Sequence, residues 1–209
     1  FIYLNIKGKT IWIFRFFSVI LHAEIKASYQ NMNNKGNLTD ERPPLLPVIF
    51  GTGFGSGVWP WGPGTAGSIL ATLIWLGLAA WGGINGEHLQ TLTLALVILS
   101  TLVGTWATAQ LQPYWGADPS RVVIDEMAGV WIPLSLLVPY DELGHAHDSW
   151  WWALVALILF RFFDMVKPLG IKRLDRMKGA FYVMADDLLG GVYAAITMVI
   201  IKIIVAWVR

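Results

Sequence analysis

The chain has no cysteine and few charged residues, and both shortages narrow its possible functions. Without cysteine there can be no disulfide, no thiolate metal site and no cysteine nucleophile, so cysteine-dependent phosphatases are excluded. Charged residues make up 14% of the 209 residues, whereas soluble domains usually carry about 25%. The net charge of +1, with no basic stripe interleaved with aromatic residues, argues against a nucleic-acid partner.

Apolar residues are abundant instead: 56% of the chain is hydrophobic, and it contains 12 tryptophans. A soluble core could account for one apolar run of near-spanning length, but not for several. The sequence therefore predicts an all-α, polytopic membrane protein with about four to five apolar helices in one domain, residues 48–209. The five apolar segments are approximately residues 66–81, 89–108, 122–140, 150–163 and 188–208. The segments 66–81 and 150–163 are short, so one segment could be re-entrant.

Residues 1–47 differ from the rest of the chain. The apolar run within them is only about a dozen residues long and includes Arg15, which is too short for a confident span. We expect a poorly structured or interfacial N-terminal extension. Residues 1–31 could also be an artefact of start assignment, with Met32 as the alternative first residue.

The distribution of basic residues predicts the orientation in the membrane. Lys and Arg are absent from residues 43–120 and 122–160, and they gather in the loop 167–178. By the positive-inside rule this basic loop faces the cytoplasm. Counting spans from it places the glycine-rich stretch 51–68 and the loop 112–121 on the same side. All the chemically interesting stretches thus reach one face.

Five carboxylates lie near that face. Ionisable residues at membrane depth are expensive and are functional by default, although an acidic residue at a helix N-terminus can also be explained by the helix dipole. Mg²⁺ is the natural counter-ion, because it prefers hard oxygen ligands and phosphate oxygens. The five are Asp125, Glu126, Asp164, Asp186 and Asp187.

Basic residues supply further positive charge at the same face. Carboxylates, a metal ion and arginine together favour phosphoryl chemistry, in which phosphate is neutralised and a water is aligned. Attraction to anionic lipid head groups is the alternative role for the basic loop. The candidate phosphate-binding cations are Arg161, Lys167, Arg176 and Lys178, with Arg173 and Lys172 nearby.

The stretch 51–68, GTGFGSGVWPWGPGTAGS, contains seven glycines but lacks the G-K-[ST] ending of a Walker A loop. Its exposed N–H groups could approach phosphate oxygens near a helix N-terminus. We therefore include Thr52, Gly53, Thr65 and Ser68 as candidate substrate-binding residues. Helix capping is the alternative role for Thr65 and Ser68. The histidines His88, His145 and His147 fall on the opposite loops, so no histidine is given a catalytic role.

Three motifs resemble the phosphatidylglycerophosphatase A family in the expected order. They are GTGFGSGVWPWGPGTAGS, VVIDEMAGVW and FRFFDMVKPLGIKRLDRMKGAFYVMADDLLGG, and the resemblance covers roughly residues 48–200. It implies an all-helical, Mg²⁺-dependent lipid phosphatase of the bacterial inner membrane with a cytoplasmic active site. The implied reaction removes the terminal phosphate of phosphatidylglycerophosphate to give phosphatidylglycerol. Membrane lipids are the other expected partners; no protein partner is inferred.

The resemblance also suggests roles for the carboxylates. As a hypothesis, Asp125, Asp186 and Asp187 hold Mg²⁺, and a metal-bound water attacks phosphorus. Glu126 or Asp164 is then the general base or an orienting group. An aspartyl-phosphate intermediate is the alternative chemistry, and the sequence does not separate the two.

Two other functions fit the sequence less well. A CDP-alcohol phosphotransferase is disfavoured because its D-G-x-x-A-R motif is absent. A transporter or channel using the carboxylates as an ion path remains the main alternative. Transport favours charges near the bilayer centre and internal repeats, and neither is evident here.

Overall fold

The computed structural model describes residues 5–6, 9–10, 42–80, 86–137, 149–168 and 170–208. Apart from the antiparallel two-residue strands β1 (Asn5–Ile6) and β2 (Lys9–Thr10), the described chain is helical. The helices are α2 (Leu45–Gly51), the 3₁₀ turn η1 (Ser56–Val58), α3 (Pro63–Ala80), α4 (Gly86–Trp115), α5 (Ile124–Leu134), α6 (Ser149–Val166), α7 (Ile171–Asp175) and α8 (Ala180–Val208). The predicted all-α fold is confirmed, and each of the five apolar segments corresponds to one helix. Most of the extension 1–47, including the possible start at Met32, lies outside the described residues.

Three of these helices are long and apolar enough to cross a membrane: α3 with 18 residues, α4 with 30 and α8 with 29. The helix formed by segment 122–140 is shorter than expected, because α5 has only 11 residues and ends just after Pro133. At 1.5 Å per residue, α5 is about 16 Å long, roughly half of a hydrocarbon core. α6 has 18 residues but carries Arg161 and Asp164 in its last two turns.

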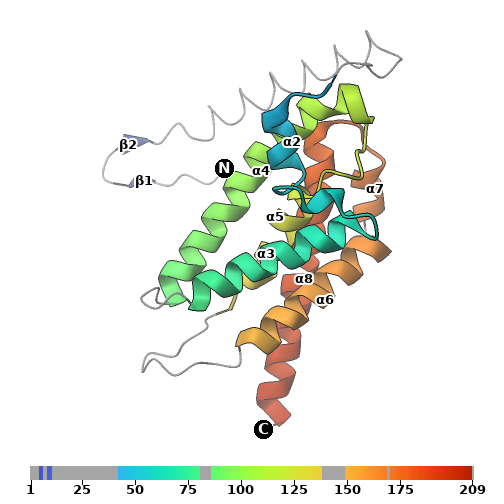
Figure 1. The fold of residues 1–209 in the computed structure, drawn as a ribbon. Coiled ribbons are helices and arrows are strands. Elements are labelled where there is room, and N and C mark those ends of the chain that lie inside the picture. The colour runs from blue at the N-terminus through green and yellow to red at the C-terminus, as the bar shows by residue number, and fades with distance from the viewer. Residues whose placement is uncertain are drawn as a thin grey trace.

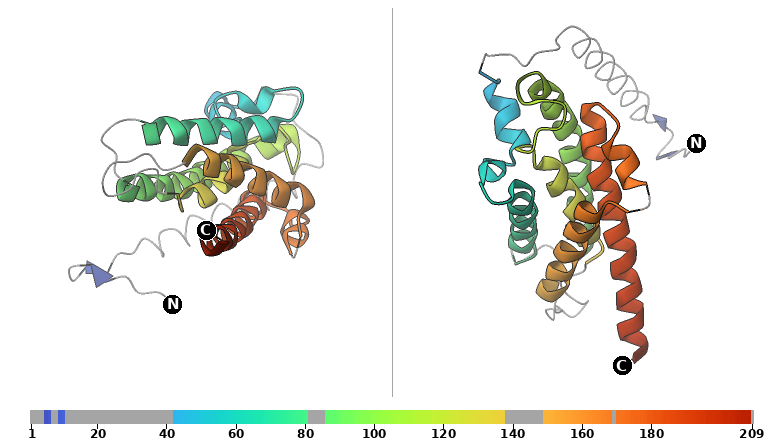
Figure 2. Two further views of the ribbon diagram at one scale, coloured as in Figure 1. Left: turned by 90° about the horizontal axis from the view of Figure 1, so that it is seen from below. Right: turned by 90° about the vertical axis from the view of Figure 1, so that its right-hand side faces the viewer.

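The short helix α5 is the centre of the fold. It packs against α8, α4, α3 and α6, and nearly all of its residues are buried. Figure 1 shows α5 enclosed by the longer helices, and the view from below in Figure 2 shows α3 and α8 on opposite sides of the bundle. A helix surrounded in this way is held by protein rather than by lipid, so its short length does not conflict with a membrane location.

Two glycines bring α5 and α8 into backbone contact. A Cβ atom on Gly191 would overlap the carbonyl oxygen of Gly129, and one on Gly129 would overlap the ring of Phe160. Small residues at a crossing allow helices to approach closely, a common arrangement between membrane helices. Asp125 and Asp187 each precede one of these glycines by one helical turn, so the crossing places both carboxylates side by side.

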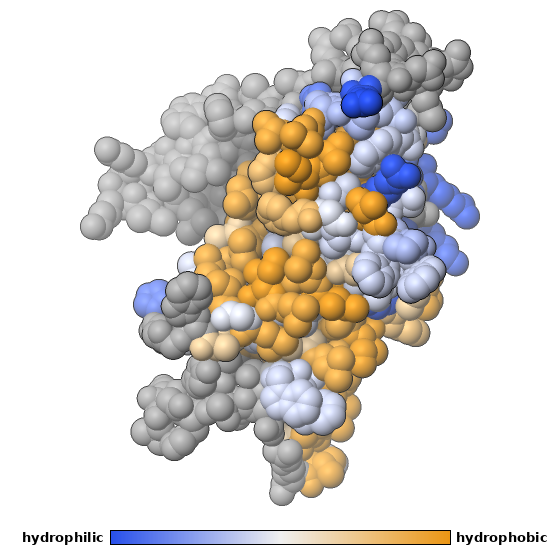
Figure 3. All heavy atoms as spheres, viewed as in Figure 1, coloured by the Kyte–Doolittle hydropathy of each residue, from blue (hydrophilic) through white to orange (hydrophobic). Residues whose placement is uncertain are grey.

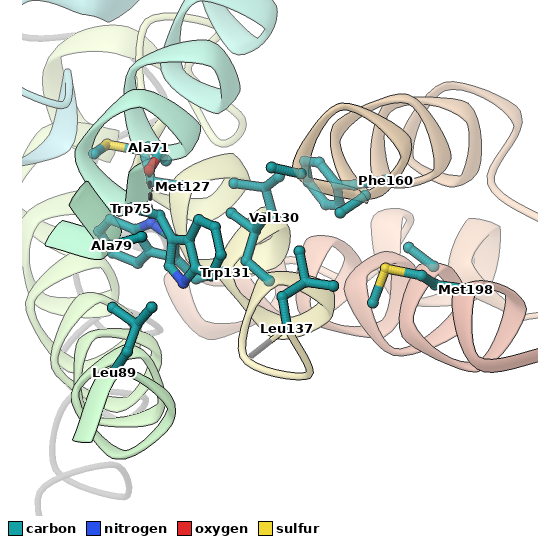
Figure 4. Close-up of a cluster of buried hydrophobic side chains, with 14 residues drawn as sticks. Ala71, Trp75, Ala79, Leu89, Met127, Val130, Trp131, Leu137, Phe160 and Met198 are labelled. Carbon is teal, nitrogen blue, oxygen red and sulfur yellow. Dashed lines mark hydrogen bonds between the residues drawn. The ribbon is translucent and has the colours of Figure 1, made fainter. Parts of the chain in front are cut away.

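Buried aromatic residues fill the hydrophobic core around α5. Trp131 donates its indole N–H to the carbonyl of Ala71 at 3.0 Å, and Trp75 donates to the Thr93 hydroxyl at 3.1 Å. Figure 4 shows Trp75 of α3, Leu89 of α4 and Trp131 of α5 converging, with Phe160 and Met198 completing the cluster. Both indole groups are satisfied, as buried tryptophans usually are. The core thus fixes α3 relative to α5.

The surface is apolar over much of its extent. In Figure 3, apolar residues cover the middle and lower part of the face shown, and hydrophilic residues gather at the upper right, near α7. The C-terminal part of α8 extends beyond the other described helices in Figure 2, and its residues there are exposed, with Ile203 at 63% and Trp207 at 88%. Such an apolar exterior suits contact with lipid.

Candidate active site

The first helical turn of α5 supplies two adjacent carboxylates. Asp125 is buried, with 7% of its surface exposed, and its Oδ1 accepts a hydrogen bond from the backbone N–H of Glu126 at 3.1 Å. Glu126 Oε2 is buried and has no hydrogen-bond partner among the described residues. The Asp125 carboxylate lies close to that of Glu126, so two negative charges are held near each other and largely out of water. This site therefore favours a neutralising cation or proton.

Helix α8 supplies the next two carboxylates from its interior. Asp186 and Asp187 lie in the second turn after Ala180, and both are buried, with 6% and 4% exposed. The dipole effect is confined to the first turn of a helix, so it does not account for this pair. Asp187 faces Asp125 across the glycine crossing described above.

Three of the five carboxylates form a compact group. One oxygen each from Asp125, Glu126 and Asp187 lies within 4.8 Å of the other two. Three hard oxygen donors this close, with one buried oxygen unpaired, match the preference of Mg²⁺ for carboxylates plus water and phosphate oxygens. The residues present therefore fit a divalent cation, and we call these three the carboxylate triad.

The other two carboxylates pair with cations. Asp164 Oδ2 lies 2.6 Å from Arg161 Nη1 one turn earlier on α6. Asp186 Oδ2 accepts a hydrogen bond from Lys167 Nζ at 2.7 Å. Arg161 Nε is buried without a hydrogen-bond partner among the described residues, so this guanidinium retains a donor for a ligand.

These groups surround one pocket of about 490 Å³. The start of α3 closes one wall: a Cβ atom on Gly64 would overlap the Glu126 carboxyl group, so a larger residue there would displace that carboxyl group. The polar residues lining the pocket are Asp118, Ser120, Asp125, Glu126, Arg161, Asp164, Lys167, Arg176, Lys178, Tyr182, Asp186 and Asp187. The structure thus brings together all five predicted carboxylates and the four predicted phosphate-binding cations.

The four candidate substrate-binding residues of the glycine-rich stretch do not line this pocket: Thr52, Gly53, Thr65 and Ser68. Thr52 donates its hydroxyl to the Val48 carbonyl at 2.7 Å, and Ser68 donates to the Gly64 carbonyl at 2.8 Å. Both hydroxyls are thus engaged within their own segments. The glycines of the stretch permit close packing instead, because a Cβ atom on Gly57 would overlap the Arg121 carbonyl. Only Gly62, Pro63 and Gly64 at its end reach the pocket.

Some residues that line the pocket were not predicted from the sequence. Asp118 and Ser120 belong to the loop between α4 and α5, and Tyr182 lies one turn before Asp186 on α8. Helical spacing from Asp186 could have identified Tyr182. His88 does not line the pocket, and His145 and His147 lie outside the described residues.

Known proteins are similar to this chain over most of its helical domain. The family model for phosphatidylglycerophosphatase A matches residues 49–202. A Bacteroides thetaiotaomicron protein, provisionally named a phosphatidylinositol-3-phosphatase, is 48% identical over 163 residues, which cover 78% of this chain and 97% of that protein.

Two relatives carry the name phosphatidylglycerophosphatase A. The Haemophilus influenzae protein is 32% identical over 76% of this chain and 90% of its own length, and the Escherichia coli protein is 32% identical over 70% and 78%. No solved structure matches the chain. The match to the family model covers most of the helical domain and includes the pocket. The chain belongs to the phosphatidylglycerophosphatase A family and is a phosphatase.

Proposed function

We propose that this protein is a Mg²⁺-dependent phosphatase that removes the terminal phosphate of phosphatidylglycerophosphate, giving phosphatidylglycerol and inorganic phosphate. The observation that carries the proposal is the carboxylate triad and the guanidinium of Arg161 facing one pocket. The names of the Haemophilus influenzae and Escherichia coli relatives support the choice of substrate.

In this proposal the triad residues Asp125, Glu126 and Asp187 hold the ion. When bound, Mg²⁺ would neutralise phosphate charge and make a coordinated water more acidic. Arg161 directs its unpaired Nε at a phosphate oxygen, and Asp164 orients the guanidinium from one turn away. Lys167, held against Asp186, supplies a second positive charge.

Proton transfer is assigned to Glu126. Its Oε2 has no partner among the described residues, so it can accept the proton of an attacking water while the other oxygen faces the triad. The water oxygen forms a bond to phosphorus, the bond from phosphorus to the glycerol oxygen breaks, and Glu126 passes the accepted proton to that leaving oxygen. Direct attack by a carboxylate, giving an aspartyl-phosphate, is the alternative.

The membrane location forms part of the same proposal. We place the protein in the bacterial inner membrane with the pocket on the cytoplasmic side. The three apolar helices support a membrane location, and the basic residues Arg176 and Lys178 at the pocket support the orientation.

A second substrate is favoured by one observation. The Bacteroides thetaiotaomicron relative at 48% identity carries a name that refers to a phosphatidylinositol 3-phosphate activity. Both lipids present a phosphate monoester on a head group, and the same triad could serve either one.

The test is phosphate release by purified protein in detergent from both lipids, measured at equal concentrations. We expect kcat/KM for phosphatidylglycerophosphate to exceed that for phosphatidylinositol 3-phosphate at least tenfold. The reverse ratio would assign the inositol lipid as substrate. Release from neither lipid by folded protein would refute a lipid phosphatase of this kind.

A further inference from the structure

Asp186 differs from its neighbour Asp187 in what it contacts. Asp187 belongs to the carboxylate triad, whereas the triad does not include Asp186. The Oδ2 of Asp186 instead lies 2.7 Å from Lys167 Nζ, and the two side chains are 8% and 24% exposed. An ammonium group at this distance occupies the carboxylate oxygen and repels a second cation, so Asp186 is poorly placed as a metal ligand.

The backbone of Lys167 is also unusual. It has φ of 47°, and among the described residues only Phe54 is another non-glycine residue with positive φ. Lys167 follows the last residue of α6, and its N–H still bonds the Phe163 carbonyl at 2.8 Å. Glycine is the usual residue at such a helix end, and a residue before proline, here Pro168, normally adopts an extended conformation.

This strained backbone has a consequence for the side chain. It turns the chain sharply at the end of α6, so that Lys167 lines the pocket beside Asp164 and Arg161 while the chain continues into the basic loop. Strained positions persist where the surrounding structure holds them, and they occur often at functional sites. The ion pair with Asp186 holds the ammonium group there.

We propose that Asp186 is a positioning residue that holds the Lys167 ammonium group against the phosphate of the substrate, and that it is not a metal ligand. This inference rests on the proposed function. The pocket then has two separate parts: the triad binds the cation, and the pairs Arg161–Asp164 and Lys167–Asp186 each present a fixed positive charge to phosphate oxygens. Fixed donors of this kind stabilise charge in the transition state without reorganising.

The test compares full-length Lys167→Met, Asp186→Asn, the double variant and Asp187→Asn in detergent. Phosphate release should fall about 100-fold in Lys167→Met and in Asp186→Asn. Because Asp186 acts through Lys167, the double variant should be no worse than Lys167→Met alone. Independent effects that multiply in the double variant would contradict the proposal.

Metal affinity is measured separately from catalytic activity. Mn²⁺ titration followed by electron paramagnetic resonance should give a Kd for Asp186→Asn within twofold of wild type, and at least tenfold weaker binding for Asp187→Asn. If Asp186→Asn weakened Mn²⁺ binding as much as Asp187→Asn, Asp186 would be a metal ligand and the proposal would be overturned. The Mn²⁺ affinities test the role of Asp186 even if wild type releases no phosphate from the lipid. Absence of phosphate release would refute the proposed function and not the role of Asp186.

Two control variants separate charge from backbone effects. Both lysine variants lose the ion pair with Asp186, but Lys167→Gly also relieves the positive φ, so it should unfold at a higher temperature than Lys167→Met yet lose as much activity. Lys172→Met removes an exposed basic residue on α7 that does not line the pocket, and it should keep full activity. Full activity in Lys167→Gly would show that the ammonium group does not act on the substrate.

Discussion

At the scale of single residues, the site combines carboxylates whose burial is costly with cations that are already paired. Asp125 and Asp187 are almost fully buried, and Glu126 has an oxygen without a partner among the described residues. Like charges this close destabilise the fold unless a cation or proton joins them. The triad therefore costs stability in the absence of metal, a common property of functional sites.

Asp187→Asn should separate stability from activity. Removing one negative charge from the metal-free triad would relieve repulsion of about 1 kcal/mol and raise Tm by about 2–4 °C for a chain of this size. The same change should abolish the extra stability that wild type gains from Mg²⁺. Thermal unfolding in detergent with EDTA and with Mg²⁺ measures both effects. A lower Tm in EDTA would show that Asp187 has a structural partner instead.

At the scale of helices, the crossing of α5 and α8 at Gly129 and Gly191 determines the geometry of the triad. Its two aspartates come from different helices, and each lies one turn before a glycine at which the backbones touch. Any side chain at the crossing must push the helices apart. The carboxylates would then separate with them.

Gly191→Leu should therefore lower phosphate release at least 100-fold and weaken Mn²⁺ binding by a similar factor, because misplacing a catalytic group by about 1 Å can cost that much. Gly77→Ala is the matched control: Gly77 is an exposed helical glycine on α3 with open space around it. It should keep activity and gain about 0.5–1 kcal/mol in stability. Normal Mn²⁺ affinity in Gly191→Leu would show that the triad does not depend on this crossing.

The sequence predicted these helices well but not their contacts. Length and hydropathy were enough to locate each apolar helix, because both are local properties. Length and hydropathy did not show that α5 is short and enclosed. That arrangement depends on contacts with other helices: Trp131 binds the carbonyl of Ala71 on α3, and Gly129 contacts Gly191 on α8. The charged residues that line the pocket were predicted as a group because charge is rare in this chain. Thr52 and Ser68 were included for their hydroxyls, yet these are engaged by backbone carbonyls a turn earlier, a partner that residue type alone does not reveal.

At the scale of the whole molecule, a lysine and tryptophan group lies far from the pocket along α8. Lys202 follows Asp186 by 16 residues on α8, or about 24 Å at 1.5 Å per residue. Its ammonium group lies 5.2 Å from the ring centre of Trp152, beside Trp150 and Trp151 at the start of α6. Lysine and tryptophan together are typical of the membrane interface. Apolar residues such as Ile203 continue α8 beyond Lys202, so this group is a second polar level along α8 and not the end of its apolar surface.

The absence of cysteine makes the proposed orientation in the membrane directly testable. In intact cells, a membrane-impermeant maleimide should label Glu87→Cys, at the start of α4, and should not label Lys172→Cys in the basic loop. Permeabilising the inner membrane should expose Lys172→Cys as well. Labelling of both positions in intact cells would rule out the proposed orientation.

The measurement that tests the central claim most directly is the Mg²⁺ dependence of phosphate release from phosphatidylglycerophosphate by wild type and by Asp125→Asn. The predicted result is release by wild type that EDTA abolishes and Mg²⁺ restores, with a loss of at least 100-fold in Asp125→Asn. Glu87→Gln, which changes an acidic residue outside the pocket, should match wild type. Release that survives EDTA, or that is unchanged in Asp125→Asn, would contradict a metal-binding carboxylate triad as the catalytic centre.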